Sequence, residues 1–260
     1  MVQKYIEQQL NSNDTNLVMT QGFIGHTSEG FTTTLGREGS DFTAGILAYT
    51  LNAKDVTIWK DVPGMLNADP KWFEDTVKLN QISYKEAIEL AYFGASVIHP
   101  KTIKPLQNKD IPLYVKSFVE PQNEGTKIHQ EATYDADVSS YIFKMNQTLV
   151  SLTPKDFSFV VEENLSGIFN TLALIGVKVN LMQNSAISFS FSIDTVDGIT
   201  DQLLESFQND YQVKFNKDLE LLTIRHFDEE TIQRTTANKK ILLEQRTRQT
   251  ARYLVKDIHQ

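Results

Sequence analysis

The chain has 260 residues, with 25 Lys and Arg against 33 Asp and Glu, a formal net charge of -8 and a pI near 5.2. This acidic balance disfavours a surface for nucleic acid or for an anionic membrane. The absence of cysteine excludes disulfides and thiolate metal sites and is typical of a reducing cytosol. No apolar run approaches the roughly 20 residues of a membrane helix, and the first residues lack the apolar core of a signal peptide. We therefore expect a soluble cytoplasmic protein with no nucleic-acid or membrane partner.

Glycine and proline are concentrated in the first half of the chain. Nine of the 12 glycines and six of the seven prolines lie at or before Gly125. The chain is long enough for two domains, because single cores rarely keep growing beyond about 250 residues. The polar stretches 120–125 and 133–137 place the boundary near residues 125 to 140. We expect one domain over residues 1–130 and a second over residues 140–260.

Before this boundary, short apolar runs alternate with helical patterns, as a parallel α/β sheet requires. An apolar run at 17–19 precedes the first glycines, residues 41–51 predict a helix, and residues 56–59 predict a buried strand. The class predicted for this half is therefore α/β.

Two further elements follow in the same half. Ser83 and Glu86 form a capping-box pattern that predicts a helix through Phe93. Residues 111–115 predict a strand. Pro112 inside it indicates a sheet edge, because proline cannot donate a hydrogen bond to a strand ladder.

After the boundary the pattern becomes β-α-β-β-α-β, which predicts a ferredoxin-like unit. Apolar residues at i, i+3, i+4 and i+7 from Leu165 to Leu172 predict a helix that ends at Gly176. The other elements of the unit are expected at 147–153, 177–181, 187–193, 196–207 and 211–215. A partial second unit is expected at 219–225, 228–236, 240–247 and 252–255.

The segment Gly22–Ala44 is a turn-rich loop with five glycines that opens into a helical pattern. Glycine lets the backbone approach a ligand closely and adopt positive φ. Ser40 is interpreted as the N-cap of the following helix, whose N–H groups and dipole favour an anion. Arg37 can bind a carboxylate or phosphate with two hydrogen bonds. The loop is expected to hold an anion, although a surface turn that caps a helix would show the same pattern.

Four more motifs follow the glycine loop in order: Ile58–Met65, Ala68–Lys71, Glu86–Ala95 and Val97–Pro100. Together they resemble the aspartate kinase family, from about residue 18 to residue 128 and more weakly through the family's regulatory ACT region. The resemblance is to the C-terminal portion. It implies the later half of an amino-acid-kinase domain, with part of its parallel sheet sandwich, followed by tandem ferredoxin-like ACT domains.

The resemblance implies a function in amino-acid biosynthesis. Aspartate kinase transfers the γ-phosphoryl of ATP, bound with Mg²⁺, to the side-chain carboxylate of L-aspartate, which opens the route to lysine, threonine and methionine. The family's N-terminal lysine-phenylalanine-glycine-glycine-threonine-serine motif is not found, so we expect the isolated chain to be inactive and its incomplete sheet to expose an apolar face. A non-catalytic regulatory subunit or effector-binding fragment is the alternative. Another amino-acid kinase, for glutamate or uridylate, would explain the first half but not the paired regulatory units.

The same resemblance assigns site residues. Arg37, Gly39 and Ser40 would contact aspartate, and Asp41 would be the catalytic residue beside the transferring group. The nucleotide would contact Lys60, Asp61, Leu66, Lys71, Ser96 and Val97. No metal site formed by the protein alone is expected.

The chain departs from the family pattern at three of these places. Glu38 stands where glycine is usual, which is tolerable if its side chain points to solvent. Lys71 replaces the usual arginine, and Ser96 stands where many members have lysine. His99 is interpreted as structural.

The resemblance implies a pocket for an amino-acid effector between ACT units, which commonly pair into homodimers and other homo-oligomers; lysine, threonine or no effector at all remain open. In lysine-sensitive relatives an aspartate and a glutamate mark the pocket, and Asn180 and Ala186 stand at those places here. Their replacement weakens the case for a cationic ligand. The candidate effector contacts are Ser158, Asn164, Leu165, Asn180, Asn184 and Ser185.

Overall fold

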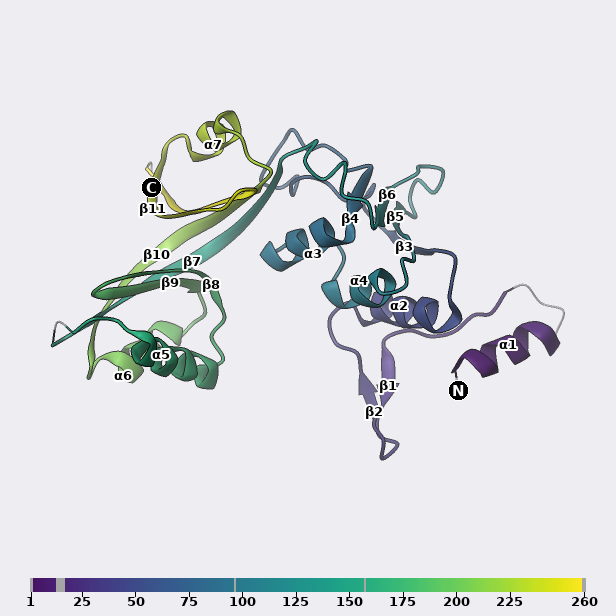
Figure 1. Cartoon of the computed structure of the whole chain (residues 1–260), viewed down its shortest axis with the longest axis horizontal. Helices are drawn as coiled ribbons and strands as arrows, with labels where there is room; N and C mark the ends of the chain where they lie inside the picture. The colour runs from purple at the N-terminus through teal and green to yellow at the C-terminus, as the bar shows by residue number, and fades with distance from the viewer. Residues whose placement is uncertain (1, 13–16, 96, 157, 259–260) are drawn as a thin grey trace. The chain divides into compact units, whose positions relative to one another are not determined.

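A computed structural model describes residues 2–12, 17–95, 97–156 and 158–258 (Figure 1). The chain divides into two compact units, unit 1 up to Ile142 and unit 2 from Phe143 onwards. Within the described residues, no helix is both long and apolar enough to cross a membrane.

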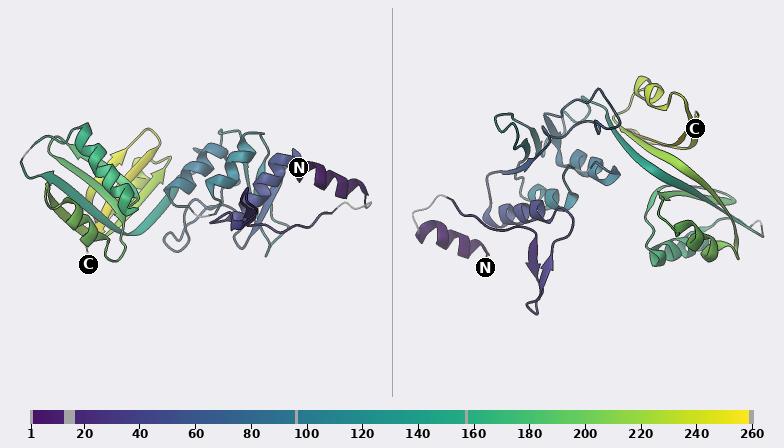
Figure 2. Two further views of the ribbon diagram at one scale, coloured as in Figure 1. Left: turned by 90° about the horizontal axis from the view of Figure 1, so that it is seen from below. Right: turned by 180° about the vertical axis from the view of Figure 1, so that it is seen from behind.

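Unit 1 contains a four-stranded sheet in the order β3-β5-β6-β4. Strands β3 and β5 pair in parallel, as do β4 and β6, whereas β5 and β6 are antiparallel. Buried side chains such as Ile58, Val115 and Ile128 form the core of this unit with residues from three helices, which lie together on one side of the sheet in both views of Figure 2. The strands are β3 (Val56–Lys60), β4 (Gln81–Ser83), β5 (Leu113–Ser117) and β6 (Thr126–His129), and the helices are α2 (Gly39–Leu51), α3 (Tyr84–Phe93) and α4 (Pro100–Gln107).

The start of the chain forms smaller elements. Helix α1 (Val2–Ser12) comes first, and β1 (Ile24–His26) pairs with β2 (Thr32–Thr34) in an antiparallel hairpin that projects from unit 1 in Figure 1. The apolar run at 17–19 forms neither helix nor strand. Its Leu17 and Met19 are 75% and 90% exposed, so the run contributes nothing to a core.

The prediction of a sheet edge at Pro112 is wrong. Strand β5 begins one residue later, at Leu113, and lies between β3 and β6. Pro112 therefore needs no N–H for the ladder, and its carbonyl accepts a hydrogen bond from the Val56 N–H at 2.9 Å.

The predicted helix at Ser83 is confirmed, but only half of the capping box forms. The Ser83 hydroxyl accepts a hydrogen bond from the Glu86 N–H at 3.0 Å. The Ser83 N–H itself goes to Asp135 Oδ1 at 2.7 Å rather than to Glu86. A carboxylate distant in sequence has therefore replaced the local partner.

Unit 2 contains a six-stranded sheet in the order β11-β12-β10-β7-β9-β8. Its first six elements run β7-α5-β8-β9-α6-β10, so the predicted ferredoxin-like unit is confirmed. Phe189, Phe191 and Ile193 alternate on the β9 face that packs against α5 and α6. The helices are α5 (Glu162–Ile175), α6 (Ile199–Phe207) and α7 (Glu229–Thr236), and the strands are β7 (Ser140–Pro154), β8 (Val179–Ser185), β9 (Ser188–Asp194), β10 (Tyr211–Arg225), β11 (Lys239–Arg246) and β12 (Thr250–Asp257).

Two strands of this sheet are much longer than predicted. Strand β10 joins the expected strands 211–215 and 219–225 into one of 15 residues, and β7 is equally long. Each contains one left-handed residue near its middle, Asn146 with φ 54° and Asp218 with φ 58°. Asn and Asp tolerate this conformation better than most residues. The later part of β10 then pairs with β12, which completes the expected partial second unit with α7 and β11.

Candidate functional site

Helix α2 begins at Gly39, two residues earlier than predicted, and Ser40 is not its N-cap. The N-cap is Glu38, whose backbone is left-handed at φ 53° and whose side chain makes no capping hydrogen bond. The chain at Phe23 crosses the helix start so closely that a Cβ on Gly39 would lie 2.7 Å from the Phe23 ring. Glycine is therefore needed at this crossing, which fixes where the helix begins and leaves Ser40 in its first turn.

Asp41 and Lys60, predicted separately, meet at the carboxyl end of β3. The Asp41 side chain comes from the first turn of α2, and its Oδ2 lies 2.7 Å from Lys60 Nζ. Both side chains are largely buried, at 15% and 24% exposure. Ligands of open α/β sheets bind beyond the carboxyl ends of the strands. The ion pair therefore occupies the position expected of a phosphate-handling group.

Arg37 stands four residues before Asp41, in the turn that leads into α2, and is mostly exposed. Its side chain is 74% exposed, and its Nε lies 4.0 Å from Glu38 Oε1. The expectation that Glu38 points to solvent is wrong, because its side chain is only 17% exposed. Its backbone is left-handed and forms the turn into α2.

A long loop, residues 61–80, joins β3 to β4 and contains three of the predicted nucleotide contacts. It is closed at its base by a short antiparallel pairing, in which the Leu79 N–H donates to the Met65 carbonyl at 2.9 Å. Gly64, at φ 143°, allows this closure, because a Cβ there would lie 2.6 Å from Thr126 Oγ1. We call residues 61–80 the β3–β4 loop. Within it Asp61 and Lys71 are exposed, and Leu66 is partly buried.

The remaining predicted contacts of unit 1 have different outcomes. Ser96 lies outside the described residues, and Val97 is partly buried against the core. His99 is structural, as predicted, because its Nδ1 accepts a hydrogen bond from the Lys101 N–H at 3.1 Å and caps α4.

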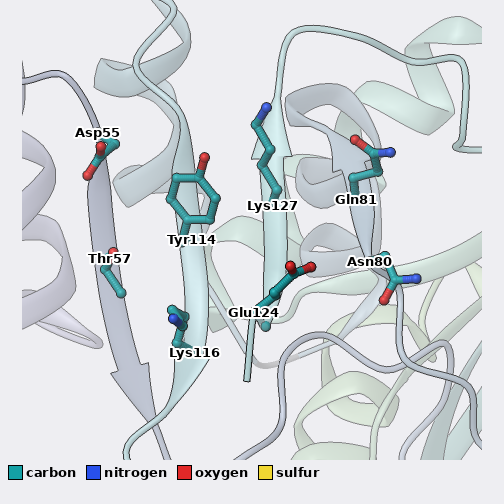
Figure 3. Close-up of a pocket in the computed structure, with 9 residues that line it drawn as sticks. Asp55, Thr57, Asn80, Gln81, Tyr114, Lys116, Glu124 and Lys127 are labelled. Carbon is teal, nitrogen blue, oxygen red and sulfur yellow. The ribbon is translucent and has the colours of Figure 1, made fainter. Parts of the chain in front are cut away.

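The sheet of unit 1 presents a polar face on the side away from its helices (Figure 3). A cavity of about 560 Å³ lies there. Side chains with the opposite alternation to the core point into it, among them Tyr114, Lys116 and Lys127. The side chains that line this cavity are polar, so they are not the expected exposed apolar face. The full lining is Asp55, Thr57, Asn80, Gln81, Tyr114, Lys116, Glu124, Gly125 and Lys127.

In unit 2 most of the predicted effector residues gather near the start of α5 and the β8–β9 turn. The Val160 N–H donates to the Ala186 carbonyl at 2.8 Å and ties the segment after Ser158 to that turn. Asn164 Oδ1 accepts from the Val161 N–H at 3.1 Å, so this side chain caps the first turn of α5. The Ser185 and Ser188 hydroxyls share a hydrogen bond, with their Oγ atoms 2.8 Å apart. Asn184 is exposed, and Leu165 packs against the core.

Asn180 lies at the other end of β8, in a polar cluster that the sequence did not reveal. Its amide donates to Gln147 Oε1 and to Asp194 Oδ1, each at 2.9 Å, and accepts from Lys144 Nζ at 2.8 Å. Burial raises the pKa of Asp194, but hydrogen bonds from Gln147, the charge of Lys144 and the Asn180 amide outweigh it, so the pKa lies below its usual value. Asp194 also borders a cavity of about 360 Å³ beside Gly176 and the start of α6, which none of the predicted effector residues line.

Among the described residues, no group of three or more His, Cys, Asp or Glu side chains could hold a metal ion. Asp41 is already paired with Lys60.

The chain matches the amino acid kinase family model over residues 2–117. It is 38% identical over 183 residues to the lysine-sensitive aspartokinase 3 of Escherichia coli (strain K12), covering 69% of this chain and 40% of that protein. The crystal structure of E. coli aspartokinase III with lysine and aspartate covers 96% of this chain at 30% identity, with a TM-score of 0.76. The structure of the same enzyme with aspartate and ADP covers 98%, also at 30% identity, with a TM-score of 0.75.

The chain is an aspartokinase relative. The match extends across both units and confirms the resemblance seen in the motifs, including its amino-acid-kinase and ferredoxin-like parts. The chain spans 40% of the E. coli aspartokinase 3 sequence and about 60% of the chain in the crystal structures, 59% and 60% in the two complexes.

Proposed function

We propose that the chain acts in aspartate kinase catalysis, the transfer of the ATP γ-phosphoryl to the side-chain carboxylate of L-aspartate. The observation that carries this proposal is the Asp41–Lys60 ion pair at the carboxyl end of β3, with the exposed Arg37 in the turn that leads into the helix of Asp41. Phosphoryl transfer depends on positioning and charge neutralisation more than on covalent chemistry. A carboxylate paired with an ammonium, and a guanidinium in the adjoining turn, meet both needs.

The roles follow from the geometry and the family resemblance together. Arg37 would bind the aspartate carboxylate, with Gly39 and Ser40 at the start of α2 beside it. Asp41 would hold Lys60 toward the transferring phosphoryl and orient the acceptor. The nucleotide would lie along the β3–β4 loop, in contact with Lys60, Asp61, Leu66, Lys71, Ser96 and Val97.

Magnesium enters this proposal only with the nucleotide. Mg²⁺ is commonly bound by substrate phosphates and one or two carboxylates rather than by a protein cage.

Substitutions at Arg37 and Asp41 should impair different kinetic constants of the enzyme. The test uses a chimera in which E. coli aspartokinase 3 supplies the segment that this chain does not match, assayed by hydroxamate formation with ATP, magnesium and aspartate. Arg37→Ala should mainly raise KM for aspartate. The loss of binding free energy should be about 2 kcal/mol, the contribution of one charge-assisted contact. Asp41→Asn should mainly lower kcat, since its interaction strengthens in the transition state.

The isolated 260-residue chain serves as the comparison and should show no appreciable turnover. If both substitutions lowered thermal stability alone and left KM and kcat unchanged, the loop would be a capped turn and the proposed site would be wrong.

Unit 2 supports a second candidate function, that of a regulatory subunit or effector-binding fragment without catalysis. The observation that favours it is the complete ferredoxin-like unit of β7 to β10, which has a core of its own. Its ligand would be lysine or threonine, held near Ser158, Asn164, Leu165, Asn184 and Ser185, with Asn180 at the far end of β8. Calorimetric titration of the chain with each amino acid distinguishes this role from catalysis. We also propose a cytoplasmic homodimer formed through unit 2.

A further inference from the structure

Asn67 is a buried residue of the β3–β4 loop whose polar groups bind two different segments. It is 5% exposed. Its N–H donates to the Val77 carbonyl at 2.9 Å, and its Oδ1 accepts from the Val77 N–H at 2.7 Å, which closes the loop. Its Nδ2 donates to the Ser139 carbonyl at 3.0 Å, and its own carbonyl accepts from the Tyr141 N–H at 2.7 Å.

Only an amide side chain of this length satisfies both partners. A carboxylate could accept from Val77 but would face the Ser139 carbonyl without a proton to donate. An aliphatic side chain would leave a buried donor and a buried acceptor unpaired, which is costly inside a protein. The side chain therefore requires the β3–β4 loop and the start of β7 to lie together.

Tyr141 also contacts the β3–β4 loop through its side chain, near Phe73. Its ring stacks on Phe73, with the ring centroids 4.6 Å apart and the planes at 17°. The Phe73 N–H bonds to the Asp69 carbonyl at 3.1 Å, and Asp69 Oδ1 accepts from the Lys71 N–H at 2.9 Å. The turn that carries Lys71 is thus fixed to the Tyr141 ring.

The segment before Tyr141 is itself anchored on unit 1. Asp135 accepts from both the N–H and the hydroxyl of Ser83, at 2.7 and 2.5 Å. Ile142 is 7% exposed and belongs to the core of this unit. The same strand, β7, continues to Pro154 and pairs with β9 from Gln147 onwards.

We propose that Asn67 and Tyr141 are positioning residues, a clasp that holds the Lys71 turn in place for the nucleotide. The proposal rests on the proposed nucleotide role of the β3–β4 loop. Neither residue touches the reacting groups. They act by keeping the turn ordered before the nucleotide arrives, so that binding does not have to fix its backbone. The start of β7 therefore also sets the geometry of the β3–β4 loop.

The test measures ADP binding to the 260-residue chain through a fluorophore within the loop. The chain has two tryptophans, and Trp59→Phe leaves Trp72, 51% exposed and next to Lys71, as the only reporter. In this background Asn67→Leu keeps the number and branching of the side-chain heavy atoms and removes both side-chain hydrogen bonds. Tyr141→Leu removes the ring stacking. Each should weaken ADP binding about tenfold, the effect of one lost buried polar or aromatic contact.

The matched control is Tyr84→Phe, which removes a buried hydrogen bond of unit 1 outside the loop. It should cost similar stability and leave the ADP Kd unchanged. Hydrogen exchange at residues 69–76 gives a readout without nucleotide, and it should be faster in Asn67→Leu than in Tyr84→Phe.

The two ways of being wrong can be told apart. If the parent Trp59→Phe chain fails to bind ADP, the nucleotide role of the loop is overturned, and the clasp proposal with it. If the parent binds ADP and both clasp variants bind it as tightly as the parent, the clasp does not position the turn for the nucleotide. Unchanged hydrogen exchange in the loop would lead to the same conclusion.

Discussion

Tyr84 illustrates how much one buried hydroxyl contributes to unit 1. The side chain is 1% exposed, and its hydroxyl donates to the Ile111 carbonyl at 2.7 Å. Burial, with a smaller effect from the Asp110 carboxylate, raises the pKa of Tyr84 to about 12. The hydroxyl therefore remains a donor to a higher pH than that of an ordinary tyrosine.

We predict that Tyr84→Phe lowers the free energy of unfolding by about 1 to 3 kcal/mol at pH 7, because the buried Ile111 carbonyl loses its partner. The raised pKa adds a pH dependence of known sign. Its contribution is fully present below the ordinary tyrosine pKa of about 10 and is lost as pH rises toward 12. Urea unfolding at pH 7 and pH 11 measures both. An equal loss of stability on alkalinisation in parent and variant would contradict this account.

The candidate site shows which single residues a sequence can reveal. Asp41 and Lys60 stand in motifs of a known family, and the structure brings them to 2.7 Å. Asn67 gave no signal, because a lone amide among apolar residues fits no periodicity and its partners lie 10 and 72 residues away. Ser40 was misassigned as a cap because the contact of Phe23 with Gly39, which fixes the helix start, is not local.

At the scale of whole elements, the local sequence pattern predicted a helix or strand correctly where one face of that element packs against a single core. The i, i+3, i+4, i+7 repeat placed α5, and Gly176 ends it with φ 80°, as predicted. The long strands β7 and β10 were missed because Asn146 and Asp218 resemble turn residues, whereas each is a single left-handed position inside a continuous strand. The lengths of β7 and β10 are therefore set by pairing with strands distant in sequence rather than by local residue preference.

The polar cluster at Asp194 joins the middle of β7 to the start of β8 and the end of β9, and it should make unit 2 acid-sensitive. The pKa of Asp194 is below its usual value, so its stabilising effect is present above about pH 4 and is lost as pH falls through the lowered value. Asp194→Asn should therefore lower the urea midpoint at pH 7 and lower it less at pH 3.

The matched control for Asp194→Asn is Asp197→Asn, an exposed position three residues further along the chain. It should leave both urea midpoints close to the parent. Equal shifts for Asp194→Asn at pH 7 and pH 3 would show that the carboxylate charge is not what stabilises this junction.

At the scale of the whole chain, the two units have separate cores, and the edges of the larger sheet remain open within the described residues. One outer strand is β8 and the other is β11. An edge strand presents unpaired N–H and C=O groups to any partner. Met182 on β8 is 49% exposed and Ile241 on β11 is 43% exposed, so each edge also carries an apolar side chain.

We predict that the chain forms a homodimer in which β8 of one copy meets β8 of the other. Met182→Lys would place an unpaired ammonium in that interface and should weaken dimerisation roughly 100-fold. Ile241→Lys introduces the same charge at the opposite edge of the same sheet and should leave the dimer intact. Size-exclusion chromatography with light scattering across a range of micromolar concentrations measures both. A monomeric parent chain would exclude the dimer, and dissociation by Ile241→Lys alone would move the interface to β11.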